Sequence, residues 1–147
     1  MYKRILVATD GSKLAQKAVD SAIDLAALCG AELLALRVVP RYPQSYFEGS
    51  IPLSSEDVAR MEKQWSDDGR TTVEAVKTAG EAKGVQVKPI LAKSDIVSDA
   101  LIAAAKKHEV DLIVMASHGR KGVKRLLLGS ETLQVLTHSE TPVLVLR

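Results

Sequence analysis

The sequence has little that would commit it to a redox, membrane or nucleic-acid role. Cys29 is its single cysteine, so neither an internal disulfide nor a cysteine metal cluster can form. No stretch of the chain reaches the roughly 18 apolar residues of a membrane-spanning helix. Acidic and basic residues nearly cancel to +2, which gives no reason to expect nucleic acid. The first residues show no signal-peptide pattern, so we expect a cytoplasmic protein without a membrane partner.

The composition is that of an ordinary globular protein. Apolar residues make up 46% and charged residues 26% of the 147 positions, close to the average for soluble domains. This length suits one domain, and it buries enough surface for a stable core without crosslinks. We therefore expect residues 1–147 to form a single domain.

Five short apolar runs alternate with four longer amphipathic segments. The first, second and fourth runs are apolar without alternation, as in parallel strands covered on both faces. The third run alternates and contains Pro89, which cannot donate to a strand ladder, so we place that strand at a sheet edge. The five runs are residues 5–8, 33–39, 85–91, 112–116 and 143–146.

The intervening segments have the apolar spacing of helices. Ser12 is placed to cap the first helix and Ser54 the second, which we expect to run over 54–83 and to stop at Gly84. Gly69 and Gly80 weaken this helix, so we predict a break or a frayed end there. The other two helices are expected over 97–108 and 130–138. Strands alternating with helices predict an α/β protein with helices on both faces of a parallel sheet.

Ligands of such sheets bind beyond the carboxyl ends of the strands, where the strand order reverses. The segment 117–130, which follows the fourth run, holds three of the nine glycines and four basic residues, and it ends at a helix N-terminus. Flexible glycine backbone and unpaired helix amides together favour a phosphate. Gly129 and Ser130 lie where that phosphate would bind, with Ser130 placed either to cap the helix or to donate. Glu131 would repel a phosphate unless it faces solvent or holds a metal.

Several alternatives stay open at this point. A tight connection with a solvated basic face would also explain the loop. Asp10 could alternatively be a plain cap for the first helix, whereas a phospho-acceptor role would need further acidic residues before it. The three histidines are too scattered to predict a metal site. Ser12 and Ser130 lack an evident base, so we predict no catalytic residue.

Segments 8–12, 111–120, 126–130 and 141–145 resemble, in order, the landmarks of the universal stress protein family, and the resemblance covers essentially the whole chain. Nucleotide-binding members of that family carry Gly-x-x-Gly, nine residues, and then Gly-Ser or Gly-Thr. Gly119, the nine residues after it, and Gly129-Ser130 fit this motif. Ala116 stands where the motif has its first glycine.

The resemblance implies a Rossmann-like fold with strand order 3-2-1-4-5 and a site for ATP, or another adenine nucleotide, with Mg²⁺. By position, Ala8 and Val38 would line the adenine pocket and Asp10 would lie near the adenosine. Gly119, Gly129 and Ser130 would hold the phosphates. The full expected ATP-binding set is Ala8, Thr9, Asp10, Val38, Ala116, Ser117, His118, Gly119, Arg120, Gly122, Gly129, Ser130 and Glu131.

By the same resemblance, the protein would act as a nucleotide-dependent stress-response module or switch. It would not be an enzyme, apart from slow and incidental ATP hydrolysis. The alternative is a dimeric interaction protein of the same fold that has lost nucleotide binding. In either case the apolar run 143–146 would lie at a sheet edge, where it can pair with the same strand of a second copy. We therefore expect a homodimer through this strand.

Overall fold

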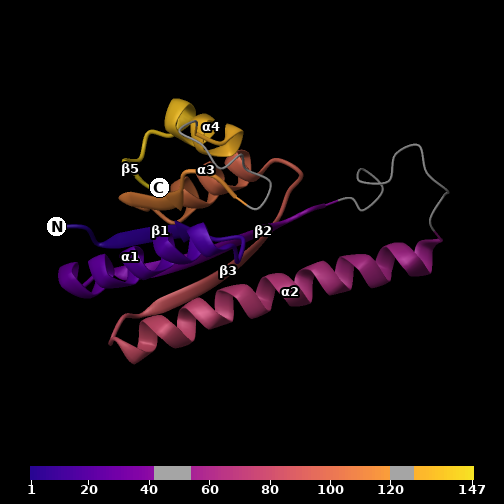
Figure 1. Cartoon of the computed structure of the whole chain (residues 1–147), viewed down its shortest axis with the longest axis horizontal. Helices are drawn as coiled ribbons and strands as arrows, with labels where there is room; N and C mark the ends of the chain where they lie inside the picture. The colour runs from indigo at the N-terminus through magenta and orange to yellow at the C-terminus, as the bar shows by residue number, and fades with distance from the viewer. Residues whose placement is uncertain (42–53, 120–127) are drawn as a thin grey trace.

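The computed structural model describes residues 1–41, 54–119 and 128–147. These residues form a five-stranded parallel sheet in the order β3-β2-β1-β4-β5 (Figure 1). The predicted α/β class and strand order are therefore confirmed, and Pro89 does lie on an edge strand. The strands are β1 (Arg4–Ala8), β2 (Glu32–Val39), β3 (Val87–Lys93), β4 (Leu112–Ala116) and β5 (Val143–Leu146).

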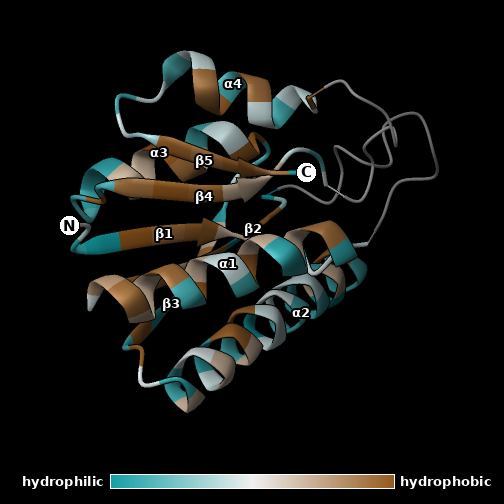
Figure 2. Cartoon of the chain, turned by 60° about the vertical axis from the view of Figure 1, so that its left-hand side comes forward, coloured by the Kyte–Doolittle hydropathy of each residue, from teal (hydrophilic) through white to brown (hydrophobic). Residues whose placement is uncertain are grey.

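Two helices cover each face of the sheet (Figure 2). Helices α1 (Lys13–Cys29) and α2 (Ser55–Ala82) pack on one face, and α3 (Val97–Lys107) and α4 (Ser130–His138) on the other. All five residues of β4 are buried, because both of its faces are covered. Within the part of the chain that the structure describes, no helix is long and apolar enough to cross a membrane.

The predicted N-terminal caps of α1 and α2 and the predicted end of α2 are confirmed. Ser12 Oγ accepts from Ala15 N at 3.2 Å, and Ser54 Oγ accepts from Asp57 N at 3.1 Å. Gly84, with φ at 76°, follows the end of α2, as its freedom to adopt positive φ allows.

The start of α4 differs from one of the expectations. Gly129 is its N-cap, and no side chain among the described residues caps this helix. Ser130 is the first helical residue instead, so its hydroxyl is not the cap of its own helix.

Helix α2 is continuous over its 28 residues, so the predicted break at its glycines was wrong. Both Gly69 and Gly80 are buried. A Cβ built on Gly80 would lie 2.4 Å from Val87 Cγ2, and one on Gly69 would lie 2.5 Å from Leu91 Cδ1. The glycines let α2 approach β3 closely, and this packing outweighs their low helix propensity.

We therefore predict that Gly80→Ala destabilises the protein by about 1–3 kcal/mol, because overpacking against the stiff Val87 exceeds the gain in helix propensity. Urea denaturation monitored by circular dichroism measures the change. Adding Val87→Ala should recover part of the loss through relief of the contact. The exposed Ala75 offers the matched control, since Ala75→Gly should cost about 1 kcal/mol from propensity alone. A stabilising Gly80→Ala would contradict the close-packing explanation.

Candidate functional site

The candidate site lies at the carboxyl edge of the sheet, where the strand order reverses between β1 and β4. The loops that follow these two strands meet there. A Cβ built on Gly119 would lie 2.6 Å from Asp10 Oδ2, so position 119 has no room for a side chain while Asp10 lies against it. The structure thus brings together two of the predicted residues that are 109 positions apart.

Asp10 is held by its own turn. Its Oδ1 accepts from Ser12 N at 2.9 Å, and Gly11, with φ at 79°, donates its N–H to Thr9 Oγ1 at 3.2 Å. Thr9 in turn is buried and donates its N–H to Leu36 O at 3.0 Å. Because Ser12 caps α1, Asp10 is not the helix cap. Its carboxylate is instead oriented toward the loop after β4.

The start of α4 is fixed against the end of β4. Gly129 N donates to Ser117 O at 2.8 Å, and Ser117 N donates to Leu146 O at 2.7 Å. The buried Thr132 adds a side-chain bond from Oγ1 to Ala116 O at 2.9 Å. A Cβ on Gly129 would lie 3.2 Å from Ser117 O. The close contact between the start of α4 and the end of β4 therefore also requires glycine at this position.

These bonds correct one detail of the expected phosphate site. The N–H of Gly129 is used inside the protein, and it is therefore not one of the amides offered to a ligand. The hydrogen-bond ladder of α4 begins with Leu133 N donating to Gly129 O. The amides of Ser130, Glu131 and Thr132 precede that ladder, and they are the ones that an anion at this helix N-terminus would meet.

Two further predicted residues border this helix start. Ser130 is exposed in the first turn. His118 is half-buried, and its Nδ1 lies 3.2 Å from Ser117 Oγ, a contact that orients the ring beside Gly129. Arg120 and Gly122 lie outside the described residues. No group of three or more histidine, cysteine or carboxylate side chains gathers as a metal site in 1–41, 54–119 and 128–147.

An apolar ledge borders the site on the face that α3 and α4 cover. Ala8, Val38 and Ala92 are half-buried there, and all three pack against the same core cluster. Ala92 is the register partner of Val38 across β2 and β3, and sequence patterns missed it because they do not specify register. A flat aromatic group stacks favourably on such a surface.

Ala116 fits its position without backbone strain. Glu109 is the one described non-glycine residue with positive φ, so Ala116 adopts a conformation that any residue tolerates. Its register partner Leu146 packs on the α1 and α2 side of the sheet. Neighbouring residues in register point to the same face, so the Ala116 methyl group points away from the ledge formed by Ala8 and Val38.

Glu131 makes a contact that the sequence did not suggest. Its Oε2 accepts from Ser98 N at 2.7 Å, and Ser98 is 3% exposed. Helix α3 has Ile96 as its N-cap and no side-chain cap from its own segment, so the carboxylate of Glu131 caps α3 from α4. The sequence suggested that the negative charge of Glu131 would repel a bound phosphate. In the structure this charge instead interacts with the N-terminus of α3.

A parallel sheet with an uncapped helix N-terminus at its point of strand reversal places the protein in the Rossmann-like α/β class. The universal stress protein family model matches residues 1–147, and the chain belongs to that family. Universal stress protein YxiE of Bacillus subtilis is 32% identical over 149 residues, covering 100% of both chains.

Two proteins of Methanocaldococcus jannaschii are similarly related. Universal stress protein MJ0531 is 32% identical over 149 residues, covering 100% of this chain and 83% of that protein. The solved structure of MJ0577 superposes with a TM-score of 0.83 at 29% identity, covering 99% of this chain and 96% of that one.

The contact between Glu131 and Ser98 yields a stability prediction. Glu131→Ala should lower the free energy of unfolding by about 1–2 kcal/mol, because α3 loses its cap and the buried Ser98 amide loses its acceptor. Glu131→Gln keeps an acceptor oxygen and should lose less than half as much. Urea denaturation gives the totals, and hydrogen exchange at the Ser98 amide gives the local effect. Gln134→Ala, at an exposed site of the same helix, is the control. Equal stability of all variants would contradict the capping role.

Proposed function

We propose that this universal stress protein binds an adenine nucleotide, ATP with Mg²⁺, at the carboxyl edge of its sheet. The observation that carries the proposal is the meeting of the Asp10 turn with Gly119 beside a helix N-terminus without a side-chain cap. A helix start of this kind binds phosphate groups through its first amides and its dipole. The protein would use this binding as a nucleotide-dependent switch in the stress response.

Each part of the site suits one part of the nucleotide. The ledge of Ala8, Val38 and Ala92 offers an apolar surface to the base. The amides from Ser130 to Thr132 would receive the phosphates. Gly129 keeps this helix start close to the end of β4, because a Cβ there would lie 3.2 Å from Ser117 O. Glu131 does not oppose them, since it is bound to Ser98 N.

The donor set also fits Mg²⁺, which takes phosphate oxygens together with one or two carboxylates. The Asp10 carboxylate and the exposed Ser130 hydroxyl are the oxygen groups that would hold it. When bound, the ion would offset the charge of the phosphates. Asp10 reaches the loop after β4 because Ser12 N fixes its other oxygen.

Other proteins of this fold have been solved with adenine nucleotides. One universal stress protein in complex with cAMP is 24% identical to this chain with a TM-score of 0.73. Another, from Archaeoglobus fulgidus in complex with dAMP, is 18% identical with a TM-score of 0.66. At these identities the likeness establishes the shared fold, and the support for binding comes from this chain's own residues at the site.

We further propose binding rather than turnover as the activity. His118 is the histidine at the described part of the site, and its Nδ1 is in contact with Ser117 Oγ. Ser117 is buried, and apart from this pair the described part of the site places no base against a serine hydroxyl, as nucleophilic catalysis would need. Any ATP hydrolysis would then be slow and incidental.

Calorimetry with ATP and Mg²⁺ tests the nucleotide site. The wild-type protein should bind with measurable heat, and Gly129→Glu should bind at least about tenfold more weakly, because its Cβ would lie 3.2 Å from Ser117 O and its carboxylate would add negative charge at the helix start. Gln134→Glu adds the same charge at an exposed position of α4 and should bind as wild type does. Circular dichroism verifies that both variants fold.

Absence of binding by the wild-type protein would overturn the proposal and favour the interaction protein without a nucleotide. Unchanged binding by Gly129→Glu would show that ATP binds elsewhere. Rapid phosphate release that is abolished by Asp10→Ala would overturn the claim that binding is the activity.

We also propose that β5 pairs with β5 of a second copy to form a homodimer. It is an edge strand, with Leu144 40% exposed, and the neighbouring helix α4 exposes Leu133 and Leu136. The carbonyls of Pro142 and Leu146 accept from Ile113 and Ser117 of the β4 segment. By alternation, the backbone of Val145 then faces outward.

Val145→Pro should therefore convert the dimer to a monomer in sedimentation equilibrium, because it removes an outward N–H without removing a bond to β4. Val145→Ala keeps the N–H and should remain dimeric. A monomeric wild-type protein, or a dimeric Val145→Pro, would overturn this proposal.

A further inference from the structure

A polar hollow of about 260 Å³ lies at the opposite edge of the sheet from the candidate nucleotide site. It is formed by the starts of β1, β2 and β3 together with the end of α3. Three cationic side chains and one carboxylate contribute to its walls, which are Arg4, Glu32, Leu34, Lys88, Lys107 and His108. Its volume is below the roughly 300–1,000 Å³ of pockets for drug-sized ligands, so it suits a small ion.

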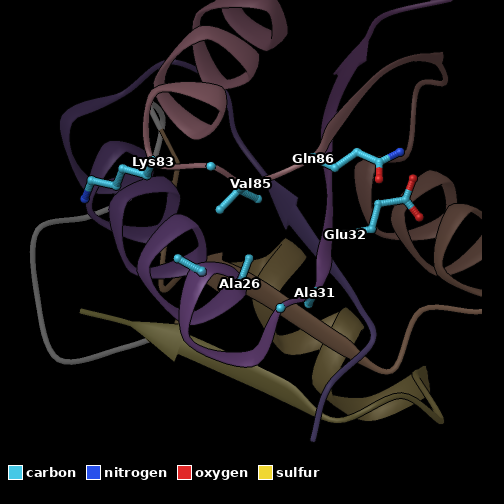
Figure 3. Close-up of a pocket in the computed structure, with 9 residues that line it drawn as sticks. Ala26, Ala31, Glu32, Lys83, Val85 and Gln86 are labelled. Atoms are coloured by element: carbon cyan, nitrogen blue, oxygen red, sulfur yellow. The ribbon is translucent and has the colours of Figure 1, made fainter.

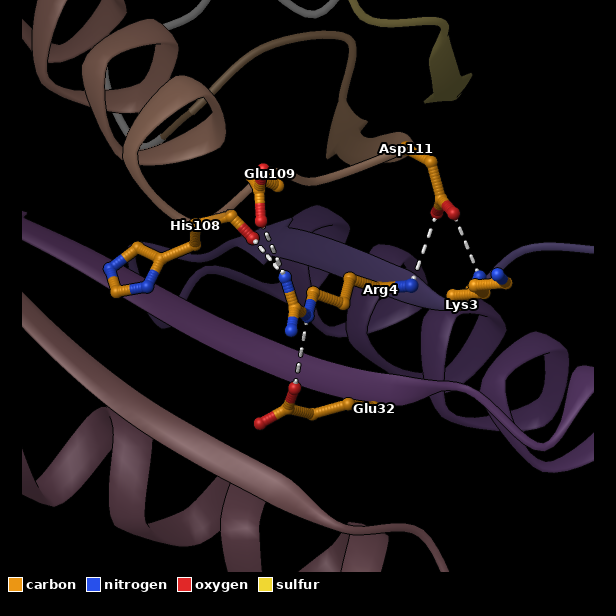
Figure 4. Close-up of polar contacts among 6 residues, drawn as sticks. All are labelled: Lys3, Arg4, Glu32, His108, Glu109 and Asp111. Atoms are coloured by element: carbon orange, nitrogen blue, oxygen red, sulfur yellow. Dashed lines mark hydrogen bonds and ion pairs between the residues drawn. The ribbon is translucent and has the colours of Figure 1, made fainter.

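Arg4 lines this hollow and is held there by contacts with three neighbouring residues (Figure 4). Its Nε lies 3.5 Å from Glu32 Oε2, and its Nη1 lies 3.4 Å from Glu109 Oε2 and donates to His108 O at 3.2 Å. These contacts join β1, β2 and the end of α3. Because these contacts engage Nε and Nη1, one donor of each guanidinium fork is already used, and Arg4 positions the walls rather than offering a free fork to a ligand.

Asp111 links the turn after α3 to the start of β1, next to Arg4. Its two carboxylate oxygens accept from Lys3 N at 2.8 Å and from Arg4 N at 3.2 Å, as Figure 4 shows. The turn after α3 is therefore attached to the first residues of β1. This attachment keeps His108 and Lys107 at a constant place relative to the sheet.

The remaining cations, Lys88 and Lys107, place positive charge on the walls of the hollow. The pKa of His108 lies below its ordinary value of 6.5, first because of partial burial and then because of Lys88, Lys107 and Arg4, while Glu32 opposes the shift. Glu109, whose side chain is 84% exposed, is directed to Arg4. The two lysines come from different elements, β3 and the end of α3, and both act on the same imidazole.

We propose that this hollow is a second anion site, which binds a small free phosphate anion through Lys88, Lys107 and His108. Lysine ammonium groups are compact charges with rotatable donors, which suit the several oxygens of a tetrahedral phosphate. A planar carboxylate is better matched by a free guanidinium fork, and Arg4 does not offer one. The site stands apart from the proposed nucleotide site and does not depend on it.

The neighbouring hollow on the same edge has a different character. It measures about 290 Å³ and is lined by small side chains and backbone of Ala26, Gly30, Ala31, Gly84 and Val85, among others (Figure 3). Its cation, Lys83, bonds to Asp24 Oδ1 at 2.5 Å, and in Figure 3 its side chain extends away from the other lining residues. We assign no ligand to this second hollow.

Pyrophosphate is the probe for the test, added to the full chain at constant ionic strength set with sodium chloride. Nuclear magnetic resonance follows the ring signals of His108, His118 and His138, which lie in separate parts of the fold. A His108→Gln variant identifies the His108 signal by its loss. Pyrophosphate should shift the His108 resonance saturably and raise its pKa, because the anion cancels the lysine charges. Lys88→Ala combined with Lys107→Ala should weaken this binding at least tenfold.

The matched control removes one lysine from each of the same two elements. Lys93→Ala combined with Lys106→Ala, both at exposed sites outside the hollow, should bind pyrophosphate within twofold of wild type. No saturable shift at His108, or equal affinity in the two double variants, would overturn the proposal. Malonate binding as tightly as pyrophosphate would overturn the assignment to phosphate. A response confined to His118 would overturn the second site while supporting the proposed nucleotide site.

Discussion

The pairing of β1 with β4 is the constraint on which the rest of this structure depends. The chain leaves β1 toward the face covered by α1 and α2, and the helix that follows β4 lies on the other face. The two connecting segments must therefore diverge at the carboxyl edge, which is where ligands of such sheets bind. Asp10 and Gly119 meet at this edge.

Glycines allow close contact at several places where a helix or loop packs against a neighbouring element of this structure. Gly69 and Gly80 bring α2 onto β3, Gly119 admits the Asp10 carboxylate, and Gly129 brings α4 onto the end of β4. At each of these glycines, atoms of a neighbouring residue occupy the space that a side chain would need. The same property has two uses here, since two of these glycines serve the core and the other two shape the candidate site.

The strands and helices were predictable because burial imposes a pattern on the sequence. Continuous apolar runs marked β1, β2 and β4, and serine caps marked α1 and α2, since both are local signals. The integrity of α2 was not predictable, because a glycine in a helix is unfavourable until a neighbour from another part of the chain packs against it. The position of Val87 opposite Gly80 depends on strand register, which no local pattern states.

The candidate site was predictable in its residues and less so in their bonds. The spacing of Gly119, Gly129 and Ser130 pointed to segments that the structure places at the carboxyl edge of the sheet. It could not show that the Gly129 amide bonds to Ser117 O, or that Glu131 reaches across to Ser98. Both depend on how β4, α3 and α4 are placed in three dimensions. The sequence also could not show whether alanine at position 116, where the family motif has glycine, would obstruct the site. Strand alternation places the Ala116 methyl group on the face of the sheet opposite the ledge of Ala8 and Val38.

The length of α2 has a mechanical consequence. Its 28 residues span about 42 Å, and its buried positions begin only at Gly69, so its first half projects past the sheet (Figure 1). That half is supported by surface ion pairs such as Lys63 with Asp67, which contribute little. Among the described residues, the fully buried contacts of this helix therefore lie in its second half, and a force applied to its first turns would be transmitted to the contacts of Gly69 and Gly80 with β3.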